Sequence, residues 1–418
     1  MKTATVALFQ LLLGISACWL SFSLLGSTAV AQAGSAIENE EKDRDLDGGR
    51  VYVMTNDAAD NVIAVFSRNE SGELTRIQDV STGGLGSGPG PLPVAFGGPG
   101  PGPLPLDSQD SLVTTEDGRF LLAVNAGSNE LSVLAVTRQG LRLVDKAPTG
   151  GIFPISIAHH RELIYVLNLG APKSFNPSPS SPNPNVTGYF LDLEGRLHMI
   201  SNSTRVTGGP LSVPDDVALS PDGKLLIVSE LMTNSLGVYP IGRDGRTKER
   251  ITVPSHKPNP FGIAFGHHHT LAVAEANEIG DGIGVPNGSS MSTYRITEEG
   301  NLEPISVAVP SNQTATCWVR FTPDGRLAYT VNAGSGTISS YRVSPSGELS
   351  LLAGVAADTG GPAAVPIDFD ITRDGRFLYV EDSFIGTIQG YRIEEDGSLT
   401  RVVNIAGFPF FMEGLVAQ

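Results

Sequence analysis

The 418-residue sequence is poor in cysteine, in basic residues and in aromatic side chains. It has two cysteines, and its 28 Lys and Arg stand against 44 Asp and Glu, which gives a formal net charge of −16. No block of Lys or Arg is present, so neither nucleic acid nor an anionic membrane surface is an expected partner. The motifs HExxH, CxxC and GxSxG are absent, as is a Gly-rich phosphate loop between a strand and a helix.

The first 31 residues have the composition of an export signal. Lys2 is the only charged residue in this segment, and an apolar run from Val6 to Leu25 precedes small-residue cleavage sites. We expect cleavage, with an uncleaved membrane anchor as the alternative, because the run approaches the length that spans a bilayer. Export predicts a secreted or periplasmic protein whose mature chain has no membrane span. With Cys317 as its one cysteine, that chain forms no internal disulfide. Residues 32–49 are polar and acidic, which predicts a flexible leader.

Glycine and proline are abundant, at 49 and 29 residues, and they punctuate a repeat of about fifty residues. Each copy consists of an Asp-Gly turn, a short apolar strand, a Gly/Ser/Asn loop and a second strand, as in DGRLAYTVNAGSGTISSYRV from Asp324. Seven copies predict an all-β fold, a seven-bladed β-propeller over residues 50–418. The first copy lacks an innermost strand, and FPFFMEGLVAQ (Phe408–Gln418) has the missing pattern. The C-terminal strand should therefore complete blade 1 and close the ring.

The long insertions are predicted to share one face of the propeller, which we call the loop face. The Asp-Gly turns occupy the opposite turn face. The insertions are Gly83–Asp107, Ala171–Asn185 and Asn277–Ser290, and the first contains GPGPLP twice. Loops elaborated on one face of a repeat usually mark the binding face, although neutral drift of surface loops is an alternative. We expect the Gly/Pro stretch to form a semi-rigid rim that delivers Gln109 and Asp110 to the channel mouth.

Acidic and amide side chains are predicted to gather at that mouth, from the starts of the inner strands and the ends of the second strands. Crowded carboxylates raise at least one pKa and provide a general acid or base. The catalytic candidates are Asp215, Glu230 and Glu413. The substrate-binding candidates are Gln109, Asp110, Asn125, Glu275, Trp318, Asn332 and Glu381.

Two further interpretations of these residues remain open. Oxygen ligands of this kind also suit a divalent cation such as Ca²⁺. Alternatively, the Asp and Asn side chains hydrogen-bond loop backbone at strand ends, which we favour for Asn125 and Asn332. Trp318 is either a stacking platform for a ring or a core residue between blades.

The histidine clusters and the lone thiol are not expected to be site residues. His159-His160 and His267–His269 resemble metal ligands, but each cluster falls at the first turn of its blade, so we interpret both as surface turns. Cys317 has no His assigned near it, so a nucleophilic role is not expected.

Three segments carry a resemblance to a known family: SPDGKLLIVSE from Ser220, TPDGRLAYTVNAGSGTISSYRV from Thr322 and TRDGRFLYVEDSFIGTIQGYRIEEDGSL from Thr372. They resemble the seven-bladed β-propeller lactonases, which include 6-phosphogluconolactonase and the carboxymuconate-lactonizing enzymes. The resemblance covers residues 50–418.

The resemblance implies lactone hydrolysis or cycloisomerisation in the central channel. It also implies His, Arg and Glu at the channel mouth, with a Pro-His pair opening an inner strand. Here Asp215 follows Pro214, and no inner strand has the Pro-His pair. Glu230 and Glu275 are positioned to match a family Glu, and Arg320 is the only Arg within an inner strand. No Arg cluster for a phosphate is evident, so we expect a neutral, sugar-like or aromatic-derived lactone.

The sequence therefore predicts an exported, monomeric, lactonase-like propeller that binds a small lactone or sugar-like ligand. The alternative is a non-catalytic binding propeller that presents its loop face to a partner. Convergence of Asp110, Asp215, Glu230 and Glu413 on one deep pocket would favour the enzyme. Carboxylates scattered and bound to backbone would favour the binding module.

Overall fold

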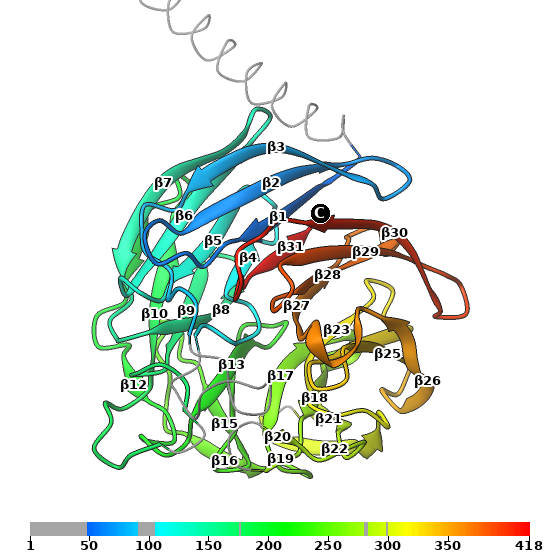
Figure 1. The fold of residues 1–418 in the computed structure, drawn as a ribbon. Helices are drawn as coiled ribbons and strands as arrows, with labels where there is room; N and C mark the ends of the chain where they lie inside the picture. The colour runs from blue at the N-terminus through cyan, green and yellow to red at the C-terminus, as the bar shows by residue number, and fades with distance from the viewer. Residues whose placement is uncertain (1–47, 91–104, 175–176, 280–282, 298–299) are drawn as a thin grey trace, which may run out of the picture. The chain divides into compact units, whose positions relative to one another are not determined.

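The computed structural model describes residues 48–90, 105–174, 177–279, 283–297 and 300–418. The expected export signal and nearly all of the expected leader lie outside these residues, as does the centre of the Gly/Pro stretch. Within the described ranges, no helix is long and apolar enough to cross a membrane. In the unit that begins at Gly49, seven of the sheets formed by the described residues are blades around a central channel, which confirms the predicted seven-bladed β-propeller (Figure 1).

Each blade is an antiparallel sheet. Blade 1 contains β1 (Arg50–Met54), β2 (Val62–Arg68), β3 (Leu74–Ser81) and β31 (Leu415–Ala417). Blade 2 contains β4 (Leu112–Thr114), β5 (Phe120–Asn125), β6 (Glu130–Thr137) and β7 (Gly140–Pro148). Blade 3 contains β8 (Pro154–His160), β9 (Leu163–Asn168), β10 (Asn185–Leu191), β11 (Leu197–Met199) and β12 (Arg205–Val206). Blade 4 contains β13 (Pro214–Leu219), β14 (Leu225–Glu230), β15 (Ser235–Pro240) and β16 (Ile251–Pro254).

The last three blades repeat the arrangement. Blade 5 contains β17 (Pro260–Phe265), β18 (Thr270–Glu275), β21 (Ser290–Ile296) and β22 (Leu302–Pro310), with the short turn η3 (His267–His269) and the separate ribbon β19 (Glu278–Ile279) and β20 (Ile283–Gly284). Blade 6 contains β23 (Thr316–Phe321), β24 (Leu327–Asn332), β25 (Thr337–Val343) and β26 (Leu349–Asp358). Blade 7, which follows η4 (Gly361–Ala363), contains β27 (Pro366–Ile371), β28 (Phe377–Asp382), β29 (Thr387–Ile393) and β30 (Leu399–Ala406).

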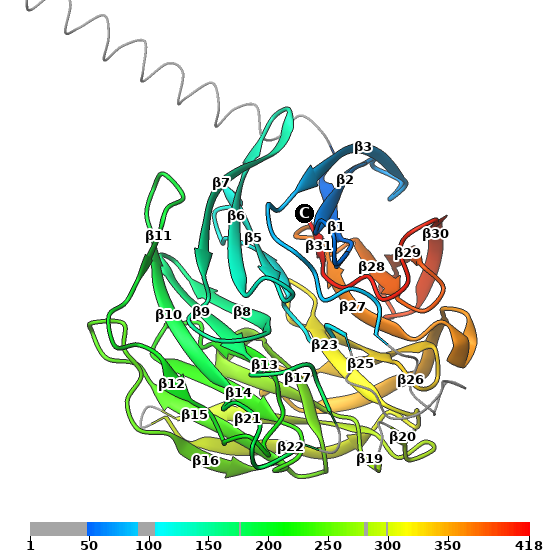
Figure 2. The same cartoon turned by 60° about the vertical axis from the view of Figure 1, so that its left-hand side comes forward.

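The ring is closed by the C-terminal strand, as the sequence predicts. β31 pairs with β1 in antiparallel register, with Tyr52 opposite Val416 (Figure 2). The backbone N–H of Gln418 donates to the carbonyl of Arg50 at 2.7 Å. The seven innermost strands, β31, β4, β8, β13, β17, β23 and β27, contact one another in a closed circle. Because the ring is closed, each blade packs against a blade on both sides.

Buried tyrosines on the second strands join neighbouring blades. The hydroxyl of Tyr379 in blade 7 donates to the carbonyl of Gly72 in blade 1 at 2.7 Å, and Tyr329 in blade 6 donates to Gly397 in blade 7 at 3.1 Å. Tyr165 in blade 3 makes the same bond to Gly245 in blade 4. Each acceptor is a glycine with a positive φ in an outer hairpin turn, a conformation that disfavours other residues. The repeated glycine of the sequence pattern is therefore also a contact between blades.

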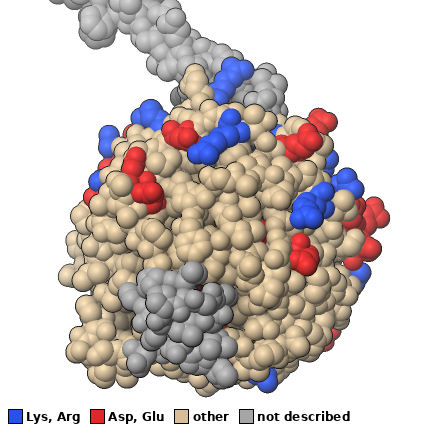
Figure 3. All heavy atoms as spheres, viewed as in Figure 1, with Lys and Arg blue, Asp and Glu red and all other residues tan. Residues whose placement is uncertain are grey.

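Charged residues are sparse on the part of the surface seen in Figure 3. Lys and Arg are interspersed there with Asp and Glu and form no basic patch on the visible described residues.

Removal of residues 415–418 should destabilise the whole propeller, because it exposes the edge of β1 and deletes the buried side chains of Leu415 and Val416. We expect a loss of about 5 kcal/mol or more in the free energy of unfolding, with aggregation. Thermal denaturation by circular dichroism, together with light scattering, measures both effects. As a control, Val355→Ala on β26, where the side chain is 52% exposed, should change stability by only about 0.5 kcal/mol. An unchanged melting curve for the truncated chain would show that β31 does not hold the ring closed.

Candidate functional site in the central channel

Acidic side chains in the channel accept the unpaired N–H groups of the innermost strands. Leu415 N–H donates to Asp368 Oδ2 and Ala417 N–H donates to Asp370 Oδ2, both at 2.9 Å. In blade 5, the N–H of Ile263 donates to Asp216 Oδ2 at 2.8 Å. A buried N–H without an acceptor costs about as much as a lost hydrogen bond, so these carboxylates have a structural role.

The side chain of Gln109, which precedes β4, spans the channel. Gln109 is fully buried; its Nε2 donates to the carbonyl of Ile263 at 2.9 Å, and its Oε1 accepts from the N–H of Val319 at 2.9 Å. A side chain that begins beside blade 2 therefore ends between blades 5 and 6. Asp107 lies on the loop-face side of Gln109 and Asp110 on the turn-face side. The predicted delivery of Gln109 and Asp110 to the channel is found, but Gln109 is a structural bridge with both polar ends occupied.

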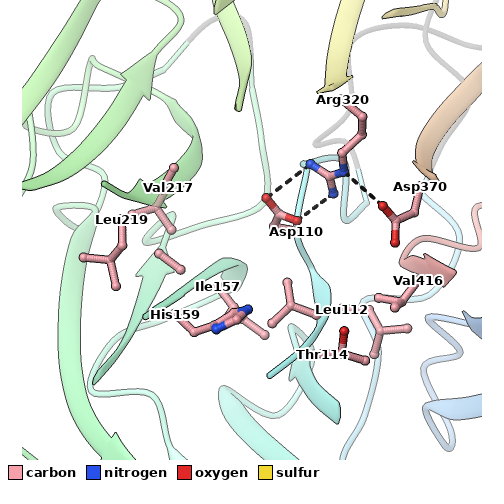
Figure 4. Close-up of a pocket in the computed structure, with 13 residues that line it drawn as sticks. Asp110, Leu112, Thr114, Ile157, His159, Val217, Leu219, Arg320, Asp370 and Val416 are labelled. Atoms are coloured by element: carbon pink, nitrogen blue, oxygen red, sulfur yellow. Dashed lines mark hydrogen bonds and ion pairs between the residues drawn. The ribbon is translucent and has the colours of Figure 1, made fainter. Parts of the chain in front are cut away.

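A cavity of about 260 Å³ lies in the turn-face half of the channel (Figure 4). Most of its lining residues are aliphatic and come from the second halves of the inner strands, but polar atoms form more of its exposed wall than apolar atoms do. Its charged groups are Asp110, Arg320 and Asp370. Arg320 Nη2 lies 2.6 Å from Asp110 Oδ1, and Arg320 Nε lies 3.6 Å from Asp370 Oδ1. These three side chains are 21%, 16% and 23% exposed, so solvent reaches them. The sequence predicts the ligand site at the loop face, whereas this cavity lies towards the turn face.

Carboxylates outnumber cations around Arg320. Asp368 Oδ1 lies 3.9 Å from Arg320 Nη2, which makes it the third carboxylate near the guanidinium. Burial raises the pKa of Asp368 to about 8 against the opposing charge of Arg320, and burial also raises the pKa of Asp370. Burial alone would lower the pKa of Arg320, but the charges of Asp110, Asp370 and Asp368 raise it. Arg320 therefore remains a cation in an acidic setting.

The interpretation of His159 as part of a surface turn is wrong. The residue belongs to β8 and lines the cavity (Figure 4). Burial lowers the pKa of its imidazole, and Nδ1 has no hydrogen-bond partner among the described residues. His159 is therefore neutral at pH 7. The turn interpretation does describe His267–His269, which form an exposed 3₁₀ turn.

Asp215 and Glu413 lie at the loop-face end and do not reach the cavity. Asp215 is fully buried and pairs with Lys173, which also contacts Asp107. Glu413 Oε1 accepts from the N–H of Ser108 at 3.1 Å, while Oε2 has no partner among the described residues. Burial raises the pKa of both carboxyls, and the contact with Lys173 opposes the rise for Asp215.

Four other candidates lie inside blades, where the second strands end. All four are fully buried, and each hydrogen-bonds a serine of the neighbouring third strand. The pairs are Asn125 with Ser132 at 2.8 Å, Glu230 with Ser235 at 3.1 Å, Glu275 with Ser290 at 2.6 Å and Asn332 with Ser339 at 2.9 Å. Glu230 also pairs with Arg250. These contacts are with side chains of the same blade rather than with loop backbone, so they differ from the strand-end alternative in the partner that each residue binds. The structure does not bring Asp110, Asp215, Glu230 and Glu413 into one pocket.

Blade 7 departs from this pattern by one residue. Asp382, rather than Glu381, takes the position inside the blade, where it accepts from Thr387 at 3.2 Å and from Gln389 at 2.7 Å. Side chains alternate between the two faces of a strand, so Glu381 faces the other way. There its Oε1 accepts from the N–H of Gly414 at 2.8 Å, and burial raises its pKa.

Trp318 is a core residue, in agreement with one of the two interpretations. It is 1% exposed and packs against Phe261, with ring centroids 5.8 Å apart. Cys317 beside it is buried, and burial raises the pKa of its thiol, which disfavours a thiolate nucleophile. No group of three or more His, Cys, Asp or Glu among the described residues is arranged to hold a metal ion.

Sequence reasoning missed the site roles of His159, Asp370 and Lys173. A signal existed for Lys173, which is the only charged residue in the insertion Ala171–Asn185. Arg320 stood out as the only Arg of an inner strand, and the structure gives it the central position in the cavity wall.

Comparison with known proteins agrees with this architecture. The model of the lactonase, 7-bladed beta-propeller family matches residues 47–169 and 282–409. A candidate 6-phosphogluconolactonase from Bacteroides fragilis superposes with a TM-score of 0.64 at 19% identity, covering 88% of this chain and 98% of that one. The periplasmic gluconolactonase of Pseudomonas aeruginosa superposes with a TM-score of 0.64 at 15% identity, with the same coverage. No curated protein matches the sequence. At these identities the structural likeness shows the fold.

The raised carboxyl pKa values predict that the protein is most stable on the acid side of neutrality. Burial raises the pKa of Glu278 and of Asp368 to about 8. The folded chain therefore binds more protons than the unfolded chain between about pH 4 and pH 8, and stability falls as pH rises through that window. His159 acts in the opposite direction, but only below about pH 6.5. We expect the melting temperature to fall from pH 6 to pH 9, and Asp368→Asn to flatten the slope. A melting temperature that rises over this range would contradict the assignment.

Proposed function

The chain belongs to the seven-bladed β-propeller lactonase family, and we propose that it hydrolyses a small, neutral lactone in the turn-face cavity. The observation that supports this proposal is the Arg320–Asp110 pair at the wall of a cavity that solvent reaches. Among the hydrogen bonds of the described residues, Asp110 is the carboxylate of the cavity whose side-chain oxygens accept no backbone N–H.

In this proposal Asp110 is the general base and Arg320 stabilises the oxyanion. Water attacks the lactone carbonyl carbon as Asp110 accepts its proton, and the carbonyl oxygen becomes negative. A guanidinium has five N–H donors, so Arg320 retains donors for this oxyanion while it binds Asp110. The tetrahedral intermediate collapses, the bond from the carbonyl carbon to the ring oxygen breaks, and that oxygen takes the proton from Asp110. The product is the open-chain hydroxy acid.

The charge and size of the cavity support a neutral substrate. The one guanidinium of the cavity already pairs with Asp110 at 2.6 Å and has Asp370 at 3.6 Å, so a phosphate or carboxylate on the substrate would meet like charge beside an occupied cation. A volume of about 260 Å³ suits a monocyclic molecule. One structural neighbour is named as a periplasmic gluconolactonase, and a sugar lactone of that kind meets both conditions. The apolar run from Val6 to Leu25 supports the accompanying proposal that the chain is exported.

A second candidate function is supported by the structural role of the channel carboxylates. Asp216, Asp368, Asp370 and Glu381 all accept backbone N–H groups, which assigns them a structural role. In this second proposal the cavity binds a neutral ligand without turnover.

Arg320→Met and Asp110→Asn should each lower kcat for a neutral sugar lactone by about 10²–10³, because each removes a group that acts in the transition state. Hydrolysis is followed by the acid released from a panel of neutral and phosphorylated lactones, with and without a chelator. Neutral lactones should be turned over faster than phosphorylated ones.

The matched control is Arg326→Met, which changes a 79% exposed Arg in the same blade and should leave kcat unchanged. A wild-type chain that hydrolyses none of the lactones would rule out the first proposal. If such a chain still bound a lactone, with binding lost in Arg320→Met, the second proposal would stand.

A further inference from the structure

The ammonium group of Lys173 is enclosed at the loop-face end of the channel by three groups from elsewhere in the chain. Lys173 belongs to the connection between β9 and β10 and is 1% exposed. Its Nζ contacts the carboxylate of Asp215 and the backbone carbonyl of Asp107, and it lies 3.1 Å from Asp107 Oδ2. The ring centroid of Phe261 is 4.7 Å from the same nitrogen.

This set of contacts has the chemistry of a receptor for a primary ammonium ion. Three N–H donors meet two carboxylates and a carbonyl, and an aromatic face adds the cation–π attraction that recognises ammonium ligands. A buried ammonium is costly unless it is paired in this way. The site also retains acceptor capacity, since Asp215 Oδ2 has no partner among the described residues and Asp215 is fully buried.

We propose that Asp107, Asp215 and Phe261 form a binding site for a primary alkylammonium group, which Lys173 of the same chain fills and thereby closes the loop-face end of the channel. Each part comes from a different element. Asp107 lies in the crossover between blades 1 and 2, Asp215 in β13 and Phe261 in β17. The lysine thus joins the insertion of blade 3 to the segment that precedes β4. The proposal does not depend on lactone hydrolysis.

Cys317 provides a reporter for the opening of this site. It is 2% exposed, and the charges of Glu278, Asp107, Asp215 and Lys173 all act on its thiol, which places it in the same surroundings. In a Cys18→Ser background it is the only thiol of the full chain. Its rate of reaction with a water-soluble disulfide reagent therefore measures access to the loop-face end of the channel.

The test is chemical rescue of Lys173→Ala in that background. The substitution removes a fragment equivalent to n-propylammonium and leaves two carboxylates without their cation. We expect Cys317 to react faster by on the order of a hundredfold, because loss of one partner from a buried ion pair favours local opening. Added n-propylammonium should slow the reaction again and raise the melting temperature. If the variant does not fold, n-propylammonium during refolding should restore the yield.

Three controls keep the outcomes separate. Lys146→Ala removes a partly exposed lysine paired with Glu130, and it should leave Cys317 protected. 1-Propanol and propionate, which have the same chain length without the positive charge, should not rescue Lys173→Ala. Lys173→Ala combined with Asp215→Asn should lose rescue by n-propylammonium. Equal effects of propanol, propionate and propylammonium would overturn the proposal, as would a thiol that reacts equally fast in the wild type and in Lys173→Ala.

Discussion

The inner edge of each blade imposes the constraint on which the channel depends. A sheet that ends at the axis leaves N–H groups without a neighbouring strand, and they lie too deep for most of them to reach solvent. Carboxylates of adjacent blades accept these groups, as when Asp368 and Asp370 bind the backbone of β31. The same bonds hold the closing strand in place. The acidity of the channel is therefore first a consequence of architecture.

The acidic residues of the channel fall into two groups, those that bind backbone N–H groups and those that bind a side chain. A carboxylate committed to backbone N–H groups has little freedom to accept a proton from water, whereas Asp110 binds Arg320 through its side chain in a solvent-reached cavity. Gln109, next to Asp110 in the chain, belongs with the structural group, because its amide binds the carbonyl of Ile263 in blade 5 and the N–H of Val319 in blade 6. Within four residues, Asp107 pairs with Lys173 at the loop-face end of the channel and Asp110 pairs with Arg320 in the turn-face cavity.

The blades were predictable because their signals are local, whereas the destinations of several side chains were not. Asp-Gly turns, apolar strands and closing glycines recur within each copy, and they establish the seven blades and the role of Phe408–Gln418. The position of Lys173 depends on the path of a Pro/Ser-rich insertion without periodicity, so no pattern places its ammonium beside Asp215. A shift of one residue at Glu381 and Asp382 exchanges their roles, and alignment of repeats does not resolve such a shift. His159 was misassigned because strand β8 continues further towards the turn than its His-His pair suggested.

The pairing of β1 with β31 has a consequence for how the protein is made. Residues 50–54 leave the ribosome early, but the strand that protects their edge consists of residues 415–417. Throughout synthesis the first blade has an open edge, and the last contact to form is also the most distant along the chain. Completed blades in the middle of the sequence can stack as they appear, while the N-terminal strands wait for their partner. A nascent chain of this protein therefore has an unpaired edge at β1 until residues 415–417 are made, and a chain that ends before residue 415 keeps that edge open.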